Sequence, residues 1–222
     1  MKLHVCWLLD PWKDTRTQYL KLWLRQGFEV CLWHGGQLAT APLPDVELRH
    51  SRDILHDSPI AEAFEQEKAF CVHAACADLF RYEVLLQQGG TYADLDVRPV
   101  RPRREFAPEP RFERDRRGKL EIRYVISPPQ HELLRELRDE AVRQEAWFFA
   151  KEGYRTHGDL VGVLRRTGPH MAARIVQAWA ERKEIPYKSL LLPQAIEAST
   201  RENRREHYTR RWLDVRARIQ SG

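Results

Sequence analysis

The sequence predicts an α/β fold in which a central sheet is flanked by helices, and three observations support this. Near the start, two apolar runs enclose a segment with apolar residues at helical spacing, which is the strand, helix, strand order of a parallel sheet. The 222 residues suit a single domain with its own core. A composition of 42% hydrophobic and 31% charged residues excludes a disordered or fibrous chain.

The first elements define the beginning of this sheet. Residues 3–9 (LHVCWLL) form a continuous apolar run that is typical of a buried strand. Residues 15–26 carry apolar side chains three and four apart, and Gly27 fits the position that follows a last helical turn. Residues 28–33 (FEVCLW) form a second strand. Together these elements predict the opening half of a nucleotide-binding sheet.

Further along the chain the elements alternate again. We expect a loop over 39–59, one long helix over 60–88 that ends at two glycines, and a strand over 91–100 with acidic residues at its end. The remaining elements are expected as an Arg- and Pro-rich loop or irregular hairpin at 101–118, a strand at 120–127, helices at 131–145 and 168–183, a last strand at 190–192 and a basic, partly helical tail at 201–219.

The net charge and the number of cysteines bear on the cellular compartment of the protein and on the kinds of partner that it can bind. The net charge is +5, and the basic excess gathers in the segments 98–118 and 201–222, where it either docks a phosphate-rich partner or is a solvated surface. Four cysteines without a CxxC pair predict reduced thiols. The run at 3–9 is too short for a signal peptide, and no run suits a membrane span. We therefore expect no transmembrane segment, and a protein that is cytoplasmic or exported without a cleaved signal peptide.

The stretch 77–100 (ADLFRYEVLLQQGGTYADLDVRPV) carries the chemistry. Asp94 and Asp96 lie two apart, so in an extended strand both carboxylates face the same side. Such a pair can hold a hard divalent cation, and ligands of open α/β sheets bind at the carboxyl ends of strands. A bare Asp-x-Asp is also compatible with a solvated strand end, so the neighbouring residues decide between the two interpretations.

Three neighbours strengthen the catalytic interpretation. Asp78 and Arg81 lie three apart on one face of the preceding helix, where they act together or form a local ion pair. Tyr92 alternates with the aspartates and either shares their face or is a core aromatic with a satisfied hydroxyl.

The string ADLFRYEVLLQQGGTYADLDV resembles the glycosyltransferase sugar-binding region containing the DXD motif, which the Och1-like mannosyltransferases and the glucosylating clostridial toxins share. The family pattern is a helix S-D-x-x-R-Y-x-x-L followed by G-G-x-Y-x-D-x-D. Every position is filled except the serine, which is Ala77 here. The segment Thr167-Gly168-Pro169 resembles the T-G-P turn of that family, and His207 and Trp212 have the spacing of its terminal H-x-x-x-x-W.

The resemblance implies a GT-A fold with a Rossmann-like central sheet, in one domain over 1–222. It implies a metal-dependent glycosyltransferase, of the hexosyltransferase type, that moves a sugar from a nucleotide-sugar donor to a hydroxyl acceptor with retention of configuration. The implied cofactor is Mn²⁺ or Mg²⁺. The first donors to consider are UDP-glucose and UDP-N-acetylglucosamine, and the acceptor is a protein, a glycan or a small molecule.

The resemblance also implies a role for each matching residue. Asp96 binds the metal directly, while Asp94 contacts hydroxyl groups of the donor and reaches the metal through water. Asp78 and Arg81 orient the donor sugar. The remaining implied roles are packing beside the ribose for Tyr92, stacking on the base for Trp7, completion of the metal shell for Glu206 or His207, and a contact to the glycosidic oxygen or β-phosphate for Trp212.

Two departures from the family pattern leave alternatives open. Arg211 stands where a serine precedes the terminal tryptophan, and Arg123 stands where an asparagine is frequent. A catalytically weak nucleotide-sugar-binding module is therefore the second hypothesis. A nucleic-acid-binding protein is the third and rests only on the arginine clusters, which lack interleaved aromatic residues; we expect no nucleic-acid partner.

Overall fold

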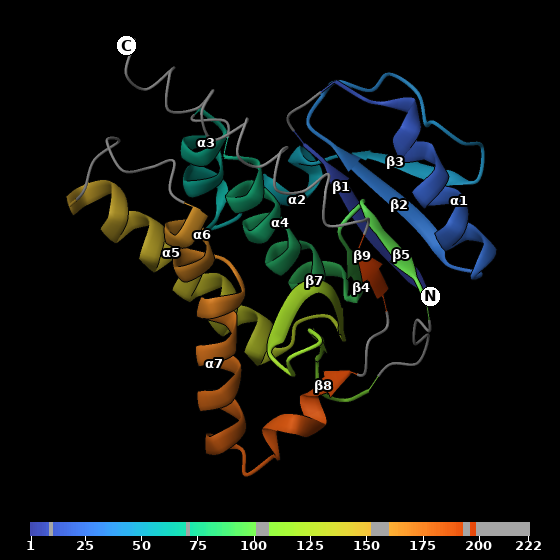
Figure 1. Cartoon of the computed structure of the whole chain (residues 1–222). Helices are drawn as coiled ribbons and strands as arrows, with labels where there is room; N and C mark the ends of the chain where they lie inside the picture. Colours follow the sequence, from blue (N-terminus) through green and yellow to red (C-terminus); the bar gives the residue numbers. More distant parts are fainter. Residues whose placement is uncertain (9–10, 70–71, 101–106, 152–159, 193–195, 199–222) are drawn as a thin grey trace.

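The computed structural model describes residues 1–8, 11–69, 72–100, 107–151, 160–192 and 196–198. Its centre is a seven-stranded sheet with the order β3-β2-β1-β4-β7-β6-β8 (Figure 1). The strands of this sheet are β1 (Lys2–Trp7), β2 (Glu29–His34), β3 (Val46–His50), β4 (Gly90–Ala93), β6 (Arg111–Arg114), β7 (Leu120–Ser127) and β8 (Leu191–Leu192). The strands β5 (Val97–Pro99) and β9 (Ile196–Ala198) form a separate antiparallel pair.

The first half of the large sheet is parallel, and this fixes where the site lies. Strand β1 pairs in parallel with β2 on one side and with β4 on the other. The carboxyl ends of β1, β2 and β4 therefore share one edge of the sheet. Strand β7 runs antiparallel to both β4 and β6.

Helix α1 (Thr17–Arg25) covers one face of the parallel strands. Its buried residues Leu20 and Trp23 share an apolar cluster with Leu3 and Val5 of β1 and with strand residues of β2. Trp23 also stacks on Tyr124 of β7, with ring centroids 5.9 Å apart. This face therefore anchors the first predicted strand, helix, strand unit, which the structure confirms.

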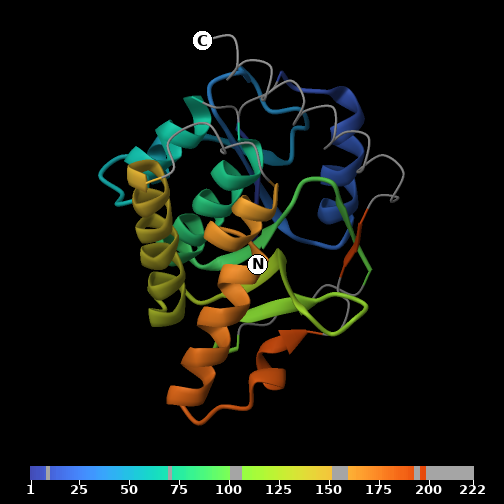
Figure 2. The ribbon, with the colours of Figure 1, turned by 60° about the vertical axis from the view of Figure 1, so that its left-hand side comes forward.

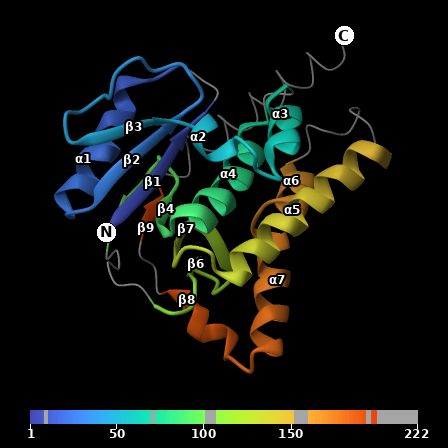
Figure 3. The same cartoon turned by 180° about the vertical axis from the view of Figure 1, so that it is seen from behind.

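The other helices gather on the opposite face, as the views from two sides show (Figures 1 and 3). They are α2 (Arg52–Leu55), α3 (Ala61–Ala69), α4 (His73–Gln88), α5 (Glu132–Lys151), α6 (Leu160–Arg166) and α7 (Pro169–Arg182), with short 3-10 turns at Asp14–Arg16 and Tyr187–Leu190. Helix α4 packs directly on the sheet, where Phe80 lies against Trp33. Figure 2 shows α5 (yellow) and α7 (orange) side by side, joined by ion pairs such as Arg182 with Glu136.

Two sequence expectations about this region are wrong. The expected loop over 39–59 contains β3 and α2, and β3 is an edge strand whose charged residues hide its alternation of Val46 and Leu48. The expected single helix over 60–88 is two helices, α3 and α4. Val72 leaves the helical conformation and is buried with Ala75 and Val163, so packing against α6 overrides a sequence without a helix-breaking residue.

The expected strand over 91–100 is also interrupted. Strand β4 ends at Ala93 and β5 begins at Val97, and the amide of Val97 donates to the carbonyl of Asp94 at 3.2 Å. The two aspartates therefore lie in a tight turn and do not alternate along an extended chain. No described helix is long and apolar enough to span a bilayer.

Gly89 and Gly90 connect the end of α4 to β4. Both have positive φ values, 63° and 95°. At Gly89 a Cβ atom would lie 2.6 Å from the backbone nitrogen of Pro129, so a side chain has no room there. The buried ring of His4 fastens this turn to β1 because its Nε2–H donates to the Gly89 carbonyl at 3.0 Å.

Candidate active site

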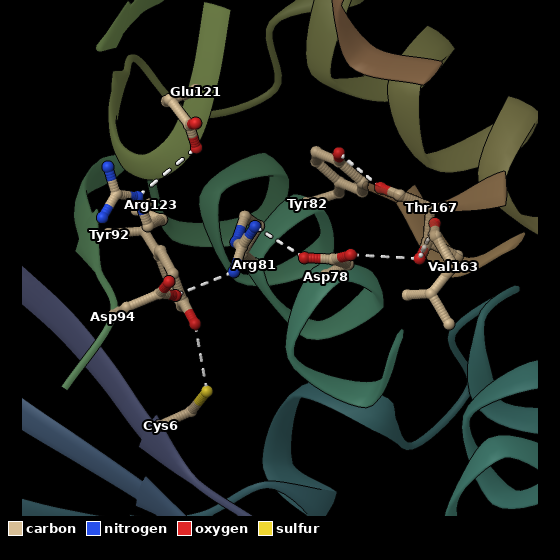
Figure 4. A network of polar contacts seen from close by, with 10 residues as sticks. All are labelled: Cys6, Asp78, Arg81, Tyr82, Tyr92, Asp94, Glu121, Arg123, Val163 and Thr167. Atoms are coloured by element: carbon tan, nitrogen blue, oxygen red, sulfur yellow. Dashed lines mark hydrogen bonds and ion pairs between the residues drawn. The ribbon is translucent and has the colours of Figure 1, made fainter. Parts of the chain in front are cut away.

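Arg81 is the centre of a polar network at the carboxyl edge of the sheet (Figure 4). Its Nη1 donates to Asp78 Oδ1 at 2.7 Å, and its Nη2 donates to Asp94 Oδ1 at 2.8 Å. The guanidinium lies 4.7 Å from the ring centroid of Tyr92, and Arg81 is only 3% exposed. The predicted Asp78–Arg81 pair is therefore present, and one guanidinium joins it to the first aspartate of the DXD turn.

Asp78 is held on both carboxylate oxygens. The hydroxyl of Thr167 donates to its Oδ2 at 3.1 Å, and Arg81 occupies its Oδ1. Thr167 belongs to the T-G-P turn before α7, and its own carbonyl accepts the Tyr82 hydroxyl at 2.8 Å. A Cβ at Gly168 would lie 2.8 Å from the Cα of Leu164, so the glycine lets this turn pack closely. The sequence predicted this turn, but it did not predict the hydrogen bond from the turn to Asp78.

Asp94 and Asp96 have different surroundings within the turn. Asp94 is partly exposed and tied to Arg81, and its backbone amide donates to the Arg123 carbonyl at 2.9 Å. Asp96 is also partly exposed, but within the described part of the chain no side chain forms a hydrogen bond or ion pair with its carboxylate. The Asp96 oxygens are therefore available to a ligand.

The electrostatics of the cluster favour a cationic or hydrogen-bond-donating ligand. Burial raises the pKa of Asp78 to about 6 and also raises the pKa of Asp94, while Arg81 opposes both shifts. With both carboxylates ionised, one guanidinium leaves the trio with a net negative charge, and Asp96 adds to it. Such a site attracts a hard cation and accepts hydrogen bonds from sugar hydroxyls.

Oxygen donors of this kind suit Mg²⁺ or Mn²⁺. Among the residues that the structure describes, no group of three or more His, Cys, Asp or Glu side chains could hold a metal by itself. The carboxylate of Asp96, without a partner among the described residues, would provide with Asp94 a partial shell that donor phosphates and water complete. The predicted ligands Glu206 and His207, and the predicted catalytic Trp212, lie outside the described residues.

Trp7 lies at the end of β1, on the same edge as the DXD turn. Its indole is partly buried, donates from Nε1 to the Pro11 carbonyl at 3.2 Å, and meets Trp12 edge-on at 6.0 Å. The guanidinium of Arg16 lies 5.3 Å from its ring centroid. The position suits a base-stacking residue, and the neighbours Trp12 and Arg16 were not expected from the sequence.

Tyr92 lies deeper than its expected role beside a ribose suggests. It is 1% exposed, it belongs to the core that α4 forms with the sheet, and its hydroxyl lies 3.1 Å from the Cys6 sulfur. Its ring supports the Arg81 guanidinium. The described structure therefore places Tyr92 in the core, where its ring packs against the guanidinium of Arg81.

Arg123 of β7 lies close to the same turn, although from the sequence it is only a departure from the family pattern. Its Nε is 3.3 Å from Glu121, and its charge opposes the raised pKa of Asp94. The expected hairpin after the DXD strand is present in part, because β6 and β7 pair antiparallel with a bulge between Phe112 and Glu113. Residues 101–106 of the basic segment lie outside the described residues.

Comparisons with known proteins agree with this geometry. Residues 12–113 match the family model described as glycosyltransferase sugar-binding region containing DXD motif. Among solved structures, the chain is similar to the PaToxG glycosyltransferase, with a TM-score of 0.63 and 15% identity over 97% of this chain and 85% of that chain. It is also similar to the UDP-bound glycosyltransferase domain from the YGT toxin, with a TM-score of 0.67 and 10% identity over 89% and 80% of the two chains. No curated protein matches the chain.

The fold is therefore that of the GT-A glycosyltransferases, as the sequence predicted. The family resemblance is likewise confirmed. The residues that match the family model, 12–113, include Asp78, Arg81 and the Asp94–Asp96 turn.

Proposed function

We propose that this protein is a metal-dependent glycosyltransferase that moves a sugar from a UDP-sugar to a hydroxyl acceptor, with retention of configuration. The observation that carries the proposal is the Asp78–Arg81–Asp94 network beside the carboxylate of Asp96, which no described side chain pairs with. A network that ties a DXD turn to a buried arginine is costly to assemble, because burying charged groups requires partners for each of them. UDP is the favoured nucleotide because the YGT toxin domain of the same fold is UDP-bound.

Each residue has a role that follows from its surroundings. Asp96 forms no ion pair with a described residue, and we therefore assign it as the direct metal ligand. Asp94 keeps one oxygen on Arg81 and offers the other to donor hydroxyls or to metal-bound water. A divalent cation held by Asp96, and through water by Asp94, would supply positive charge that stabilises the leaving nucleotide.

Arg81 and Asp78 act at the sugar end of the donor. The guanidinium is fixed by two carboxylates and an aromatic ring, so its charge is oriented before the donor arrives. Asp78 has both oxygens bonded inside the protein, and it reaches a sugar hydroxyl only with a further lone pair. Its larger contribution is to hold Arg81, while Trp7 at the end of the neighbouring strand β1 stacks on the base.

Donor hydrolysis tests the proposal without knowledge of the acceptor. UDP-glucose, UDP-N-acetylglucosamine and GDP-mannose are incubated with the protein and Mn²⁺, and nucleotide release is measured. Asp96→Asn is expected to abolish metal-dependent release and to leave the circular dichroism spectrum unchanged. Asp45→Asn is the matched control, because Asp45 is exposed and precedes β3, at the opposite end of the parallel strands.

The same assay separates transfer from binding alone. If UDP binds with Mn²⁺ but no donor of the panel is hydrolysed, the protein is a nucleotide-sugar-binding module, which the Arg211 departure already suggested. Equal turnover of Asp96→Asn and the wild type would contradict the assignment of the metal site.

A further inference from the structure

A second buried charge cluster joins α3, α5 and the end of α6. Glu67 of α3 and Glu145 of α5 are both 0% exposed, and Arg166 at the end of α6 is 5% exposed. Arg166 Nε donates to Glu145 Oε1 at 3.0 Å, and its Nη2 donates to Glu67 Oε1 at 3.3 Å. The same guanidinium lies 3.9 Å from the ring centroid of Phe148. One arginine thus joins three helices.

The charges of this cluster balance at neutral pH. Burial raises the pKa of Glu145 to about 8 and also raises the pKa of Glu67, which favours one proton held between the two carboxyls at pH 7. Arg166 then faces one carboxylate and one neutral acid. Buried ionic clusters contribute little net stability compared with apolar packing. This cluster therefore calls for a reason other than stability.

The position of Arg166 in the chain suggests that reason. Arg166 is followed directly by Thr167, whose hydroxyl donates to Asp78. The amides of Thr167 and Gly168 both donate to the Val163 carbonyl at 3.0 Å, which closes the end of α6 tightly. Fixing the guanidinium of Arg166 therefore fixes the backbone that carries the Thr167 hydroxyl.

From Thr167 an unbroken series of contacts leads to the donor site. Thr167 holds Asp78, Asp78 holds Arg81 at 2.7 Å, and Arg81 holds Asp94 at 2.8 Å (Figure 4). Neither Arg166 nor Thr167 needs to touch a donor for its position to matter.

We propose that Arg166 is a positioning residue: clamped by Glu67 and Glu145, it holds Thr167 against Asp78 and thereby sets the orientation of Arg81 toward the donor sugar. The inference rests on the proposed function for the identity of the ligand, but the positioning of Arg81 is a property of the protein alone. Outer partners of this kind usually change activity about 10- to 100-fold when removed.

Two sets of variants, at Thr167 and at Arg166, test this positioning role. Thr167→Val removes the hydroxyl and Thr167→Ser keeps it, and Thr91→Val, a buried threonine at the start of β4, is the matched control. Arg166→Met leaves Glu67 without its cation and can fail to fold, so the charge-balanced double variant Arg166→Met/Glu67→Gln accompanies it. For Thr167→Val and the double variant we expect kcat/KM for donor hydrolysis to fall about tenfold or more, with the Kd for UDP unchanged. Thr167→Ser and Thr91→Val should retain wild-type values.

A spectroscopic measurement separates this inference from the proposed function. The Nε–Hε resonance of Arg81, assigned by its loss in Arg81→Lys, reports the orientation of the guanidinium in the free protein. It is expected to shift in Thr167→Val and in the double variant, but not in Thr91→Val. If the wild type hydrolyses no donor, the proposed function fails while the resonance still decides the positioning. An unchanged Arg81 resonance in folded Thr167→Val and in the double variant would overturn the inference.

Discussion

Acid is expected to destabilise this protein through one buried histidine of the first strand. His4 is 0% exposed, its Nε2–H donates to the Gly89 carbonyl at 3.0 Å, and its Nδ1 accepts from Trp33 Nε1 at 3.1 Å. Both bonds require the neutral ring with its proton on Nε2. A second proton on Nδ1 would face the indole N–H and would charge a group that has no water around it. Burial accordingly lowers the pKa of His4 from 6.5 to about 4.

The magnitude follows from this difference in pKa. Because the unfolded chain takes up the proton near pH 6.5 and the folded protein only near pH 4, the unfolded state binds more protons in between, and the free energy of unfolding falls as the pH falls through this window. The difference in pKa corresponds to a full loss of about 3 kcal/mol, of which about 2 kcal/mol is lost by pH 5. The stabilisation by neutral His4 is fully present above pH 6.5.

Urea unfolding at pH 8, 7, 6 and 5 measures this loss, with His4→Gln as the comparison because an amide can form both hydrogen bonds but does not titrate. Asp78 and Glu145 have raised pKa values and contribute changes of the opposite sign, which cancel between the two proteins. The free energy of unfolding of the wild type relative to His4→Gln should fall by about 2 kcal/mol from pH 8 to pH 5. His170→Gln, at an exposed position of α7, controls for the substitution itself. A constant difference between wild type and His4→Gln over this range would refute the reasoning.

Three further predictions concern the candidate site and the glycine turn between α4 and β4. Arg81→Met should lower the free energy of unfolding in urea by about 3–5 kcal/mol, because it leaves the buried carboxylate of Asp78 and the partly exposed carboxylate of Asp94 without their shared cation; a loss below 1 kcal/mol would contradict the network. Gly89→Ala should lower the Tm of thermal unfolding more than Gly118→Ala does. Both glycines have positive φ, but a Cβ at Gly89 would lie 2.6 Å from Pro129, whereas nothing lies within 4 Å of a Cβ at Gly118. Trp7→Ala should weaken UDP binding by about 1–3 kcal/mol in calorimetry, and unaltered affinity would remove Trp7 from the base site.

The parts of the fold that could be predicted from the sequence are those that local periodicity decides. The apolar run at β1, the helical spacing of α1 and the run at β7 each have one strong pattern, and the structure confirms them. Strand β3 could not be predicted in this way, because a short edge strand with exposed charges shows little alternation between apolar and polar residues. The break between α3 and α4 depends on where Val72 packs, which is information from the tertiary structure.

The candidate site shows the same division. The spacing of Asp78 and Arg81 was enough to predict their pairing, because residues three apart in a helix are neighbours. The bond from Arg81 to Asp94 and the grip of Thr167 on Asp78 span 13 and 89 residues of sequence, and no local pattern encodes them. The turn at Asp94–Asp96 was missed because its residues also suit a strand, and the hydrogen bond from Val97 to Asp94 bends the chain there.

Calorimetric titration of UDP with and without Mn²⁺ tests most directly that the Asp94–Asp96 turn holds a metal-bound nucleotide. We predict that Mn²⁺ strengthens UDP binding to the wild type and to Asp45→Asn, and that this gain disappears in folded Asp96→Asn while binding without metal is retained. UDP affinity that does not respond to Mn²⁺ in the wild type, or that responds equally in Asp96→Asn, would contradict it.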